Sequence, residues 1–163
     1  MHKLDILNSK ILEGQVLDRW LSYIRFRRKT IVFTNGCFDI IHRGHVEYLA
    51  KAADMGDVLI VGLNTDASVK RLKGTQRPLQ DEITRACVLA SMFYVHAVIL
   101  FDEDTPYNLI SGIQPDILVK GGDYQPHEIA GYDIVMAKGG QVTTIPLTEG
   151  FSSTGIINRI TGY

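Results

Sequence analysis

The feature that most constrains the fold of this chain is a regular alternation of apolar runs with helical patterns. Five short runs rich in apolar residues are predicted to be strands, and they occupy residues 30–34, 58–63, 96–101, 116–121 and 141–145. Segments with helical spacing lie between them, at residues 43–55, 80–93, 105–113 and 127–139, and a short final helix is expected after Ser152. This alternation predicts βαβ units and a parallel sheet with right-handed crossovers.

The predicted strands are almost continuously apolar, which is typical of strands that helices cover on both faces. We therefore expect an α/β protein with a five-stranded parallel sheet. In such a sheet a ligand binds beyond the carboxyl ends of the strands, where the strand order reverses. The residues that follow each strand are accordingly the candidates for a functional site.

Residues 1–29 are predicted to form an N-terminal helical extension ahead of a domain at residues 30–163. Apolar residues recur at helical spacing from Leu4 to Ile24, and Gly14 weakens this pattern. The basic run RFRRK at residues 25–29 is expected to end the helical region, where cations complement the helix dipole. A phosphate-binding arm is the alternative function for this run.

The stretch FTNGCFDIIHRGHVEYL at residues 33–49 follows the first strand. Gly36 permits a close backbone approach, and the helix expected to begin near His42 would present free N–H groups to an anion. His42 and His45 share one helix face, with Gly44 leaving a gap beside them. Two such donors suit a phosphoryl group whose charge grows in a transition state. A metal site and a purely structural pair are alternatives, but no nearby Cys, Glu or third His completes a ligand set with the two histidines, and an HExxH pattern is absent.

Polar and basic residues also follow the second strand. Asn64, Thr65 and Asp66 are suited to contacting a ribose or to capping the next helix, and capping is favoured for Asp66 alone. A cationic loop is predicted next, with Lys73 as the first candidate for a polyphosphate contact. This loop contains Lys70, Arg71, Lys73, Gly74 and Arg77.

The fourth and fifth strands are followed by two further groups of interest. Lys120 ends an otherwise apolar strand ahead of the residues Gly121-Gly122-Asp123, and a plain turn would explain the glycines but not the lysine. The hydroxyl run Ser152–Thr154 is suited to capping a helix or binding phosphate. Arg85 lies within a helical pattern, where an ordinary surface ion pair would also explain it.

Composition excludes several classes of protein. The chain has 17 Lys and Arg against 18 Asp and Glu, so no global basic field indicates a nucleic-acid or membrane partner. No signal peptide and no apolar run of about 18 residues is recognisable. Cys37 and Cys87 lack CxxC spacing, which favours a reducing cytoplasm over a disulfide framework. The absence of GxxxxGK[ST], GxGxxG and GxSxG argues against P-loop kinases, dehydrogenases and α/β-hydrolases.

The segment TNGCFDIIHRGH resembles the HxGH signature of the nucleotidyltransferase superfamily, which implies a Rossmann-like fold. From about Lys29 to Ile160 the chain is similar to the adenylyltransferase domain of bacterial ADP-heptose synthesis. The similar segments are GLNTDASVKRLKGTQRPL, FDEDTPYNLISGIQPDILVKGGDYQPHEIAG and EGFSSTGIINRI. That domain is often fused to a sugar kinase, for which 163 residues leave no room, so a stand-alone form is expected.

The resemblance implies that ATP and D-glycero-β-D-manno-heptose 1-phosphate give ADP-heptose and pyrophosphate, for lipopolysaccharide core assembly. It implies catalytic roles for His42, His45 and Lys73. It implies nucleotide contacts by Thr34, Asn35, Gly36, Cys37, Phe38, Asp39, Gly44, Asn64, Asp66, Ser152, Ser153 and Thr154. It implies sugar-phosphate or adenosine contacts by Lys120, Gly121, Gly122 and Asp123, and Arg71 and Arg85 are also assigned to the substrate.

Magnesium is expected on the ATP phosphates and water rather than in a metal site made by the protein. A separate upstream sugar kinase, a cytoplasmic location and a homo-oligomeric assembly are expected as well. One alternative is a cytidylyltransferase for a small phosphorylated alcohol such as glycerol 3-phosphate. Those enzymes carry an arginine in RTEGISTT, whereas LTEGFSST here has Leu147 in its place. A non-catalytic nucleotide-binding module is the other alternative.

Overall fold

A five-stranded parallel sheet forms the centre of the computed structural model, which describes residues 2–122, 124–148 and 150–162 and, for Thr161, the backbone alone. The strand order is β3-β2-β1-β4-β5, and every neighbouring pair is parallel. The strands are β1 (Ile31–Gly36), β2 (Val58–Asn64), β3 (Ala97–Phe101), β4 (Ile117–Gly121) and β5 (Gln141–Ile145). The predicted α/β class and all five strands are confirmed.

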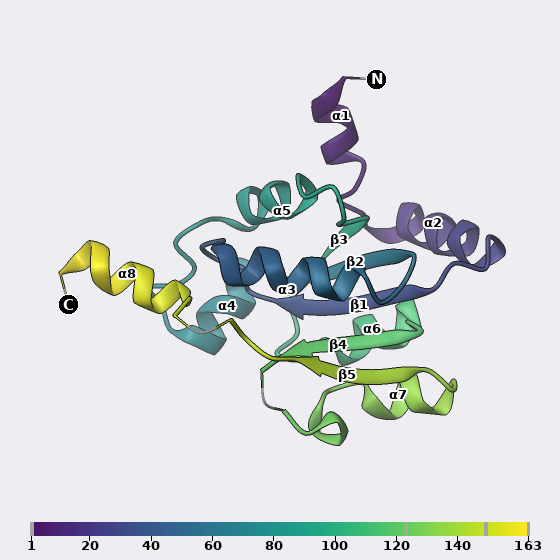
Figure 1. Ribbon diagram of the computed structural model, residues 1–163. Coiled ribbons are helices and arrows are strands. Elements are labelled where there is room, and N and C mark those ends of the chain that lie inside the picture. The colour runs from purple at the N-terminus through teal and green to yellow at the C-terminus, as the bar shows by residue number, and fades with distance from the viewer. Residues whose placement is uncertain (1, 123, 149, 163) are drawn as a thin grey trace.

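The chain builds the sheet in two directions from its middle strand. It runs outward from β1 through β2 to β3, then returns to place β4 and β5 on the other side of β1. The strand order therefore reverses between β1 and β4, and a crevice at their carboxyl ends is the expected ligand site. Figure 1 shows the two halves on either side of β1.

Helices cover both faces of the sheet, as predicted (Figure 1). On one face α3 (Arg43–Ala53) and α5 (Glu82–Ala90) bury Leu49 and Leu89 against Val32. On the other, α2 (Gly14–Phe26), α6 (Tyr107–Ile113) and α7 (Tyr132–Ala137) pack around Phe33. Val32 and Phe33 serve opposite faces because successive strand residues point in opposite directions.

The N-terminal region forms two helices rather than one continuous helical region. α1 (Lys3–Asn8) ends well before α2, whose first residue, Gly14, has a φ of +48°. Between them the Leu12 N–H donates to the Val98 carbonyl of β3 at 3.0 Å, and the Val98 N–H donates to the Lys10 carbonyl at 2.8 Å. Leu12, Leu21 and Ile24 are buried in the core, and the segment between α1 and α2 pairs with the edge strand β3 through one isolated bridge. The boundary after residue 29 stays a prediction.

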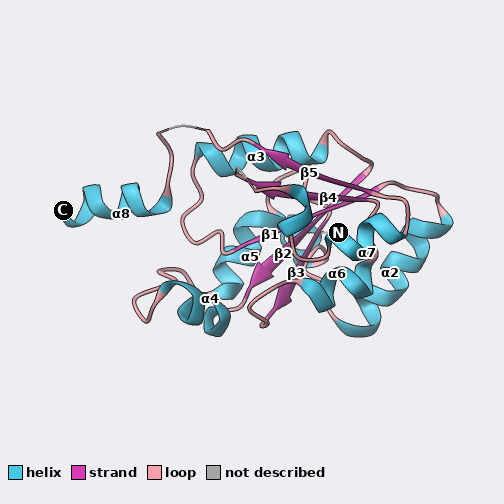
Figure 2. Ribbon diagram, turned by 90° about the horizontal axis from the view of Figure 1, so that it is seen from below, coloured by secondary structure: helices cyan, strands magenta, loops and turns pink. Residues whose placement is uncertain are grey.

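The sequence stretch predicted as a cationic loop is mostly helical. α4 (Asp66–Lys73) carries three of its cations, Lys70, Arg71 and Lys73, on its last turns and ends at Gly74, which has a φ of +92°. A 3₁₀ turn (Pro126–Glu128) precedes α7, and α8 (Ser153–Thr161) projects outward from the body in both views (Figures 1 and 2). Among the described residues, no helix is both long and apolar enough to span a membrane.

Candidate active site

A cavity of about 300 Å³ lies at the carboxyl ends of β1 and β4, where the strand order reverses. It brings together most of the residues that the sequence analysis selected. Those in its wall are Asn35, Gly36, Cys37, Phe38, Asp39, His42, Gly44, His45, Lys73, Lys120, Gly121, Ser152, Ser153 and Thr154. Because the strands are parallel, their carboxyl ends lie at the same edge of the sheet. The residues that follow different strands therefore meet there, although they are far apart in the sequence.

The two histidines lie at the N-terminus of α3. His42 is its N-cap residue, with an extended backbone, and its side chain makes no capping hydrogen bond. The two imidazole rings stack with centroids 3.9 Å apart and an interplanar angle of 20°. Both Nδ1 atoms are buried and have no hydrogen-bond partner among the described residues. Because a buried unpaired polar atom costs about 1–3 kcal/mol, the pair is suited to a ligand that supplies partners.

Gly44 allows the histidine pair to pack this closely. A Cβ atom at Gly44 would lie 3.1 Å from Nδ1 of His42 and 3.2 Å from Cβ of Phe151. Both distances are tighter than ordinary carbon contacts, so a side chain there would push against the His42 ring. A side chain at position 44 would therefore need the His42 ring or Phe151 to shift by a few tenths of an ångström.

The surroundings keep the histidines in their neutral form. Burial lowers the pKa of His42. Burial, repulsion from His42 and the positive charge of Lys73 lower the pKa of His45 to about 4. A neutral imidazole has one N–H donor and one acceptor nitrogen, so each ring is able to donate one hydrogen bond near pH 7. A bound phosphate would favour the protonated form and raise both pKa values.

Lys120 joins the ends of β4 and β1 inside the cavity. Its Nζ donates to Oδ1 of Asn35 at 3.1 Å, and burial lowers the pKa of the ammonium group. Below it, the Thr34 hydroxyl lies 2.6 Å from the Tyr48 hydroxyl, which donates to the Val119 carbonyl at 3.3 Å. Thr34 is thus buried beneath the cavity and is not in its wall, contrary to its assignment to the nucleotide.

The hydroxyl run after β5 combines the two functions that the sequence left open. The Ser152 side chain accepts a hydrogen bond from the Gly155 N–H at 2.9 Å and so caps α8. Ser153 donates to the Ile40 carbonyl at 3.1 Å, which ties the run to the loop before α3. All three residues, Ser152 to Thr154, also face the cavity. Capping and a cavity position are therefore compatible here.

Arg85 has a different position from the one expected. It is fully buried rather than part of a surface ion pair, and it does not line the cavity. Its guanidinium donates to the carbonyls of Cys37 at 2.7 Å, Asn64 at 2.9 Å and Gln80 at 3.0 Å, and to Oδ1 of Asp66 at 2.7 Å. Arg85 therefore fixes the strand ends around the cavity rather than contacting a substrate.

Two other residues assigned to the nucleotide, Asn64 and Asp66, also lie outside the cavity wall. Asp66 pairs with Arg85, and Thr65 is the residue that caps α4 by accepting from the Ser68 N–H at 3.2 Å. Asn64 is buried and donates to Oγ of Ser68 at 2.9 Å. The N-cap of α4 is therefore Thr65 rather than the expected Asp66. The ribose contacts stay a prediction.

Arg71 and Gly122, which follows β4, also lie outside the cavity wall. Arg71 is exposed and pairs with Asp104 at 3.0 Å and Asp102 at 3.5 Å. Gly122 adopts a φ of +108°, as a turn after β4 requires. Asp123 lies outside the described residues.

Asp39 lies in the cavity wall, but its carboxylate is already engaged. It accepts from Nε of Arg77 at 2.6 Å and from the N–H groups of Leu79 at 2.8 Å and Gln80 at 3.0 Å. Burial alone would raise the pKa of Asp39, but these donors outweigh it and lower the pKa. No group of three His, Cys, Asp or Glu residues in the described part of the chain is arranged to hold a metal.

Three further wall residues were not singled out from the sequence: Tyr48, Thr148 and Phe151. Two others were named there without an assigned contact, Arg77 as a member of the cationic loop and Leu147 as the residue in place of an arginine. Tyr48 follows His45 by one helical turn, so the face of α3 was a usable signal for it. Thr148 and Phe151 lie within the TEGFSST stretch at residues 148–154, and only the path of the chain after β5 brings them to the cavity.

Comparison with known proteins agrees with this architecture. The family model described as cytidylyltransferase-like matches residues 33–159, which is most of the chain. The chain belongs to the cytidylyltransferase-like family. The matched region begins in β1 and ends in α8, so it includes every strand and all segments that contribute to the cavity.

Curated relatives are considerably longer than this chain. The bifunctional protein HldE of Syntrophotalea carbinolica is 53% identical over 153 residues, which cover 94% of this chain and 31% of the relative. The bifunctional protein HldE of Campylobacter concisus is 58% identical over 133 residues, covering 82% of this chain and 27% of the relative. The chain thus spans about a third of the length of these relatives.

Two solved structures share the fold. The lipopolysaccharide core biosynthesis protein from Thermoplasma volcanium has a TM-score of 0.60 and 27% identity, over 74% of this chain and 97% of that one. The pantoate-β-alanine ligase from Francisella tularensis has a TM-score of 0.57 over 94% of this chain and 78% of that one. At 15% identity, the second likeness shows the fold alone.

The depressed pKa of His45 predicts a specific dependence of stability on pH. The folded-state pKa of about 4 lies below the ordinary 6.5, so the folded protein prefers the neutral ring. Its contribution to stability is complete above pH 6.5 and is lost as the pH falls towards 4. We expect the free energy of unfolding from urea titrations to decline over this window, and to decline less in His45→Asn. Equal slopes in both proteins would contradict the assignment.

A second prediction concerns the two lysines on the last turns of α4. Lys73 lines the cavity, whereas Lys70, one turn earlier, does not. Lys73→Ala should raise the barrier measured by kcat/KM by about 1.5–3 kcal/mol, the value of a charge-assisted phosphate contact. Lys70→Ala is the matched control and should change kcat/KM little. Similar, near-wild-type rates for both variants would show that Lys73 is a solvated surface residue.

Proposed function

We propose that the chain is an adenylyltransferase that converts ATP and D-glycero-β-D-manno-heptose 1-phosphate to ADP-heptose and pyrophosphate. The observation that carries this proposal is the stacked His42–His45 pair, which has unpartnered buried nitrogens in a cavity that also contains Lys73 and Lys120. The resemblance of the motifs to the ADP-heptose adenylyltransferase domain supports the choice of substrates. Identities of 53% and 58% to bifunctional proteins HldE, and a fold neighbour titled as a lipopolysaccharide core biosynthesis protein, support it further.

The chemistry needs little from the protein beyond positioning and electrostatics. An oxygen of the sugar phosphate is already a nucleophile near pH 7 and attacks the α-phosphorus of ATP. A new P–O bond forms as the bond to the β-phosphate oxygen breaks, and pyrophosphate leaves with the electron pair. The two imidazoles would donate to phosphoryl oxygens, while the ammonium groups would offset the negative charge on the leaving group.

Magnesium would enter this cavity bound to the phosphates of the nucleotide. The carboxylate that the described wall residues offer is that of Asp39, which is already hydrogen-bonded to Arg77, Leu79 and Gln80. We therefore infer that phosphate oxygens and water would hold the ion, as expected from the sequence. When bound, it would neutralise charge on the triphosphate.

A cytidylyltransferase is the competing function, and Leu147 is the residue that distinguishes the two. Leu147 lines the cavity, and its Cδ2 lies 3.0 Å from the position that a Cβ of Gly121 would take. It therefore gives this part of the wall an apolar surface, where cytidylyltransferases of the RTEGISTT type have an arginine. The missing arginine weakens a CTP function and supports the adenylyltransferase.

Several wider expectations stay predictions. These are the separate upstream sugar kinase, the cytoplasmic location, the homo-oligomeric assembly and the independent domain at residues 30–163. The chain spans about a third of the HldE proteins, so the remaining activities of those proteins are not attributed to it.

The nucleotide preference is directly testable. Purified protein should release pyrophosphate faster with ATP than with CTP when heptose 1-phosphate is the acceptor, because Leu147 replaces the arginine of the cytidylyltransferase pattern. Leu147→Arg should narrow the difference between the two nucleotides. Faster turnover of the unmodified protein with CTP would reject the adenylyltransferase in favour of the competing function.

The role of the histidine pair predicts that His42→Ala and His45→Ala each lower kcat far more than thermal stability. Removing a transition-state donor typically costs 10²–10³ in rate, or about 2.7–4 kcal/mol. His→Asn variants, which retain a donor, should recover part of the loss. The measurements are kcat and the midpoint of thermal unfolding for all four variants. Normal turnover by the folded fraction of destabilised alanine variants would show that the histidines are structural.

A further inference from the structure

The Arg77 guanidinium is anchored at one end and lacks a partner at the other. It lines the cavity, and its side chain is only 14% exposed. Its Nε donates to Oδ2 of Asp39 at 2.6 Å. Its Nη2 is buried, yet it has no hydrogen-bond partner in the part of the chain that the structure describes. An always-charged, buried donor of this kind is expected to meet an acceptor in the functional state.

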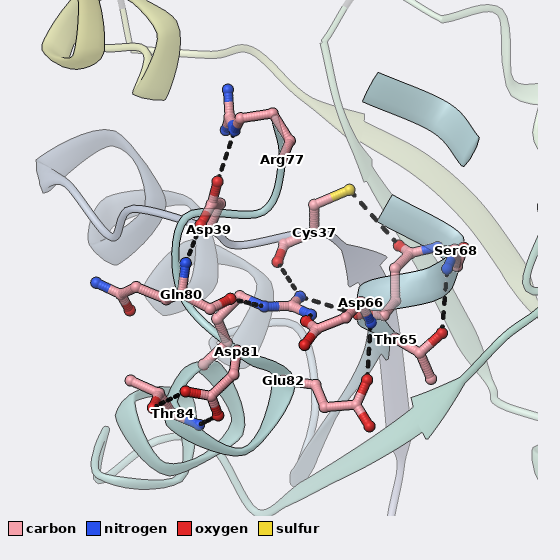
Figure 3. A network of polar contacts seen from close by, with 12 residues as sticks. Cys37, Asp39, Thr65, Asp66, Ser68, Arg77, Gln80, Asp81, Glu82 and Thr84 are labelled. Atoms are coloured by element: carbon pink, nitrogen blue, oxygen red, sulfur yellow. Dashed lines mark hydrogen bonds and ion pairs between the residues drawn. The ribbon is translucent and has the colours of Figure 1, made fainter. Parts of the chain in front are cut away.

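Asp39 determines the direction in which this donor points. The Asp39 side chain is 1% exposed, and both of its oxygens are used by Arg77 and by the N–H groups of Leu79 and Gln80. These backbone bonds hold the carboxylate against the loop that carries Arg77. Figure 3 shows a guanidinium nitrogen of Arg77 pointing away from Asp39. Asp39 therefore has little capacity left for a ligand of its own and is suited to holding Arg77 in place.

The neighbouring arginines do not have this property. Arg85 donates to three carbonyls and to Asp66, and none of its donors faces the cavity. Arg71 pairs with Asp102 and Asp104 on the exposed side of α4. Among these three, Arg77 alone combines a place in the cavity wall with an unpartnered buried nitrogen. It also shares the cavity with Lys73 and the two histidines.

We propose that Arg77 binds the triphosphate of the nucleotide by donating from Nη2 to a phosphate oxygen, with Asp39 acting as its positioning residue. The inference deepens the proposed function, because it assumes that a nucleoside triphosphate occupies the cavity. A guanidinium presents planar donors at fixed angles that match phosphate oxygens, and the ion pair with Asp39 removes most of its freedom before the ligand arrives. Lys73, at the end of α4, would supply a second cation to the same polyphosphate.

The first test is equilibrium binding, which does not require turnover. Arg77→Gln should weaken binding of both ATP and inorganic pyrophosphate at least tenfold by calorimetry, and it should leave adenosine binding unchanged. Arg77→Lys, which keeps the charge but lacks the planar fork, should lie between Arg77→Gln and the wild type. Arg19→Gln is the matched control, since Arg19 is exposed on α2, away from the cavity. Thermal midpoints would verify that each variant is folded.

The second test separates positioning from a purely structural role of Asp39. Asp39→Asn keeps an oxygen that accepts from the loop N–H groups but removes the charge opposite Arg77. If Asp39 acts through Arg77, Asp39→Asn should weaken ATP binding in the wild-type background and have no further effect in the Arg77→Gln background. Equal losses in both backgrounds would overturn the positioning role.

Each remaining result has a defined meaning. Folded Arg77→Gln that binds ATP and pyrophosphate within twofold of wild type would overturn the proposal. A loss confined to heptose 1-phosphate would also overturn it, since the contact would then belong to the acceptor. If Arg77→Gln does not fold, a several-fold loss of pyrophosphate binding in Arg77→Lys supports the contact and unchanged binding rejects it. The wild type could make no ADP-heptose while the Arg77→Gln variant still loses pyrophosphate binding. In that case the proposed function fails and this inference stands.

Discussion

The buried guanidinium of Arg85 is the interaction on which the cavity depends. A charge removed from water is costly unless hydrogen bonds and an opposite charge compensate for it. Here the compensation comes from the carbonyls of Cys37, Asn64 and Gln80 and from the Asp66 carboxylate. Cys37 directly follows β1 and Asn64 ends β2, so one side chain from α5 fixes two adjacent strand ends. The loop that leads to the histidines begins at one of these fixed points.

A second ionic contact extends this framework to the opposite side of the same loop. Asp39 lies two residues beyond Cys37, and it holds Arg77 and the backbone at residues 79 and 80. Gln80 also accepts from Arg85, so the two guanidinium groups meet at neighbouring parts of one connection between α4 and α5. Figure 3 shows the contact between Asp39 and Arg77 and the position of Gln80 beside it. The residues facing the cavity are thereby held by contacts that lie mostly outside it.

Much of the fold was predictable because it follows from local periodicity. Each strand is a short, almost continuous apolar run, and the helices of the two covering layers carry apolar residues at helical spacing. α4 was missed because its sequence is dominated by charge, with only Ser68 and Val69 buried. The sequence predicted only a weakened helix at Gly14, whereas the structure has a complete break between α1 and α2. The positive φ of Gly14 is a property of the folded backbone and cannot be read from the spacing of apolar residues.

The sequence predicted the residues of the site that lie at the ends of strands. It did not predict which polar side chains bind one another instead of facing the cavity. Four residues reach the cavity because the topology of the sheet places them near the ends of its strands. His42 and His45 lie at the start of α3, Lys73 is the last residue of α4, and Lys120 lies near the end of β4. Arg85 and Asp66 are 19 residues apart, and each was assigned to a ligand because their mutual contact is invisible in the sequence. A polar residue near a strand end is equally suited to a ligand and to another side chain, and only the folded chain decides between them.

Burial, together with the charges of the cavity, explains why its histidines are kept neutral. Burial is the main cause that lowers the pKa of both rings, and the charges of His42 and Lys73 lower the pKa of His45 further. A protonated ring would also add repulsion to a wall that already contains Lys73, Lys120 and Arg77. The described acidic residue of that wall, Asp39, is paired with Arg77 and cannot offset further positive charge. With neutral rings the ligand-free protein avoids this cost and still presents two imidazole donors. A triphosphate would reverse the sign of the local field, so that protonation of the rings becomes favourable as negative charge accumulates on the leaving group.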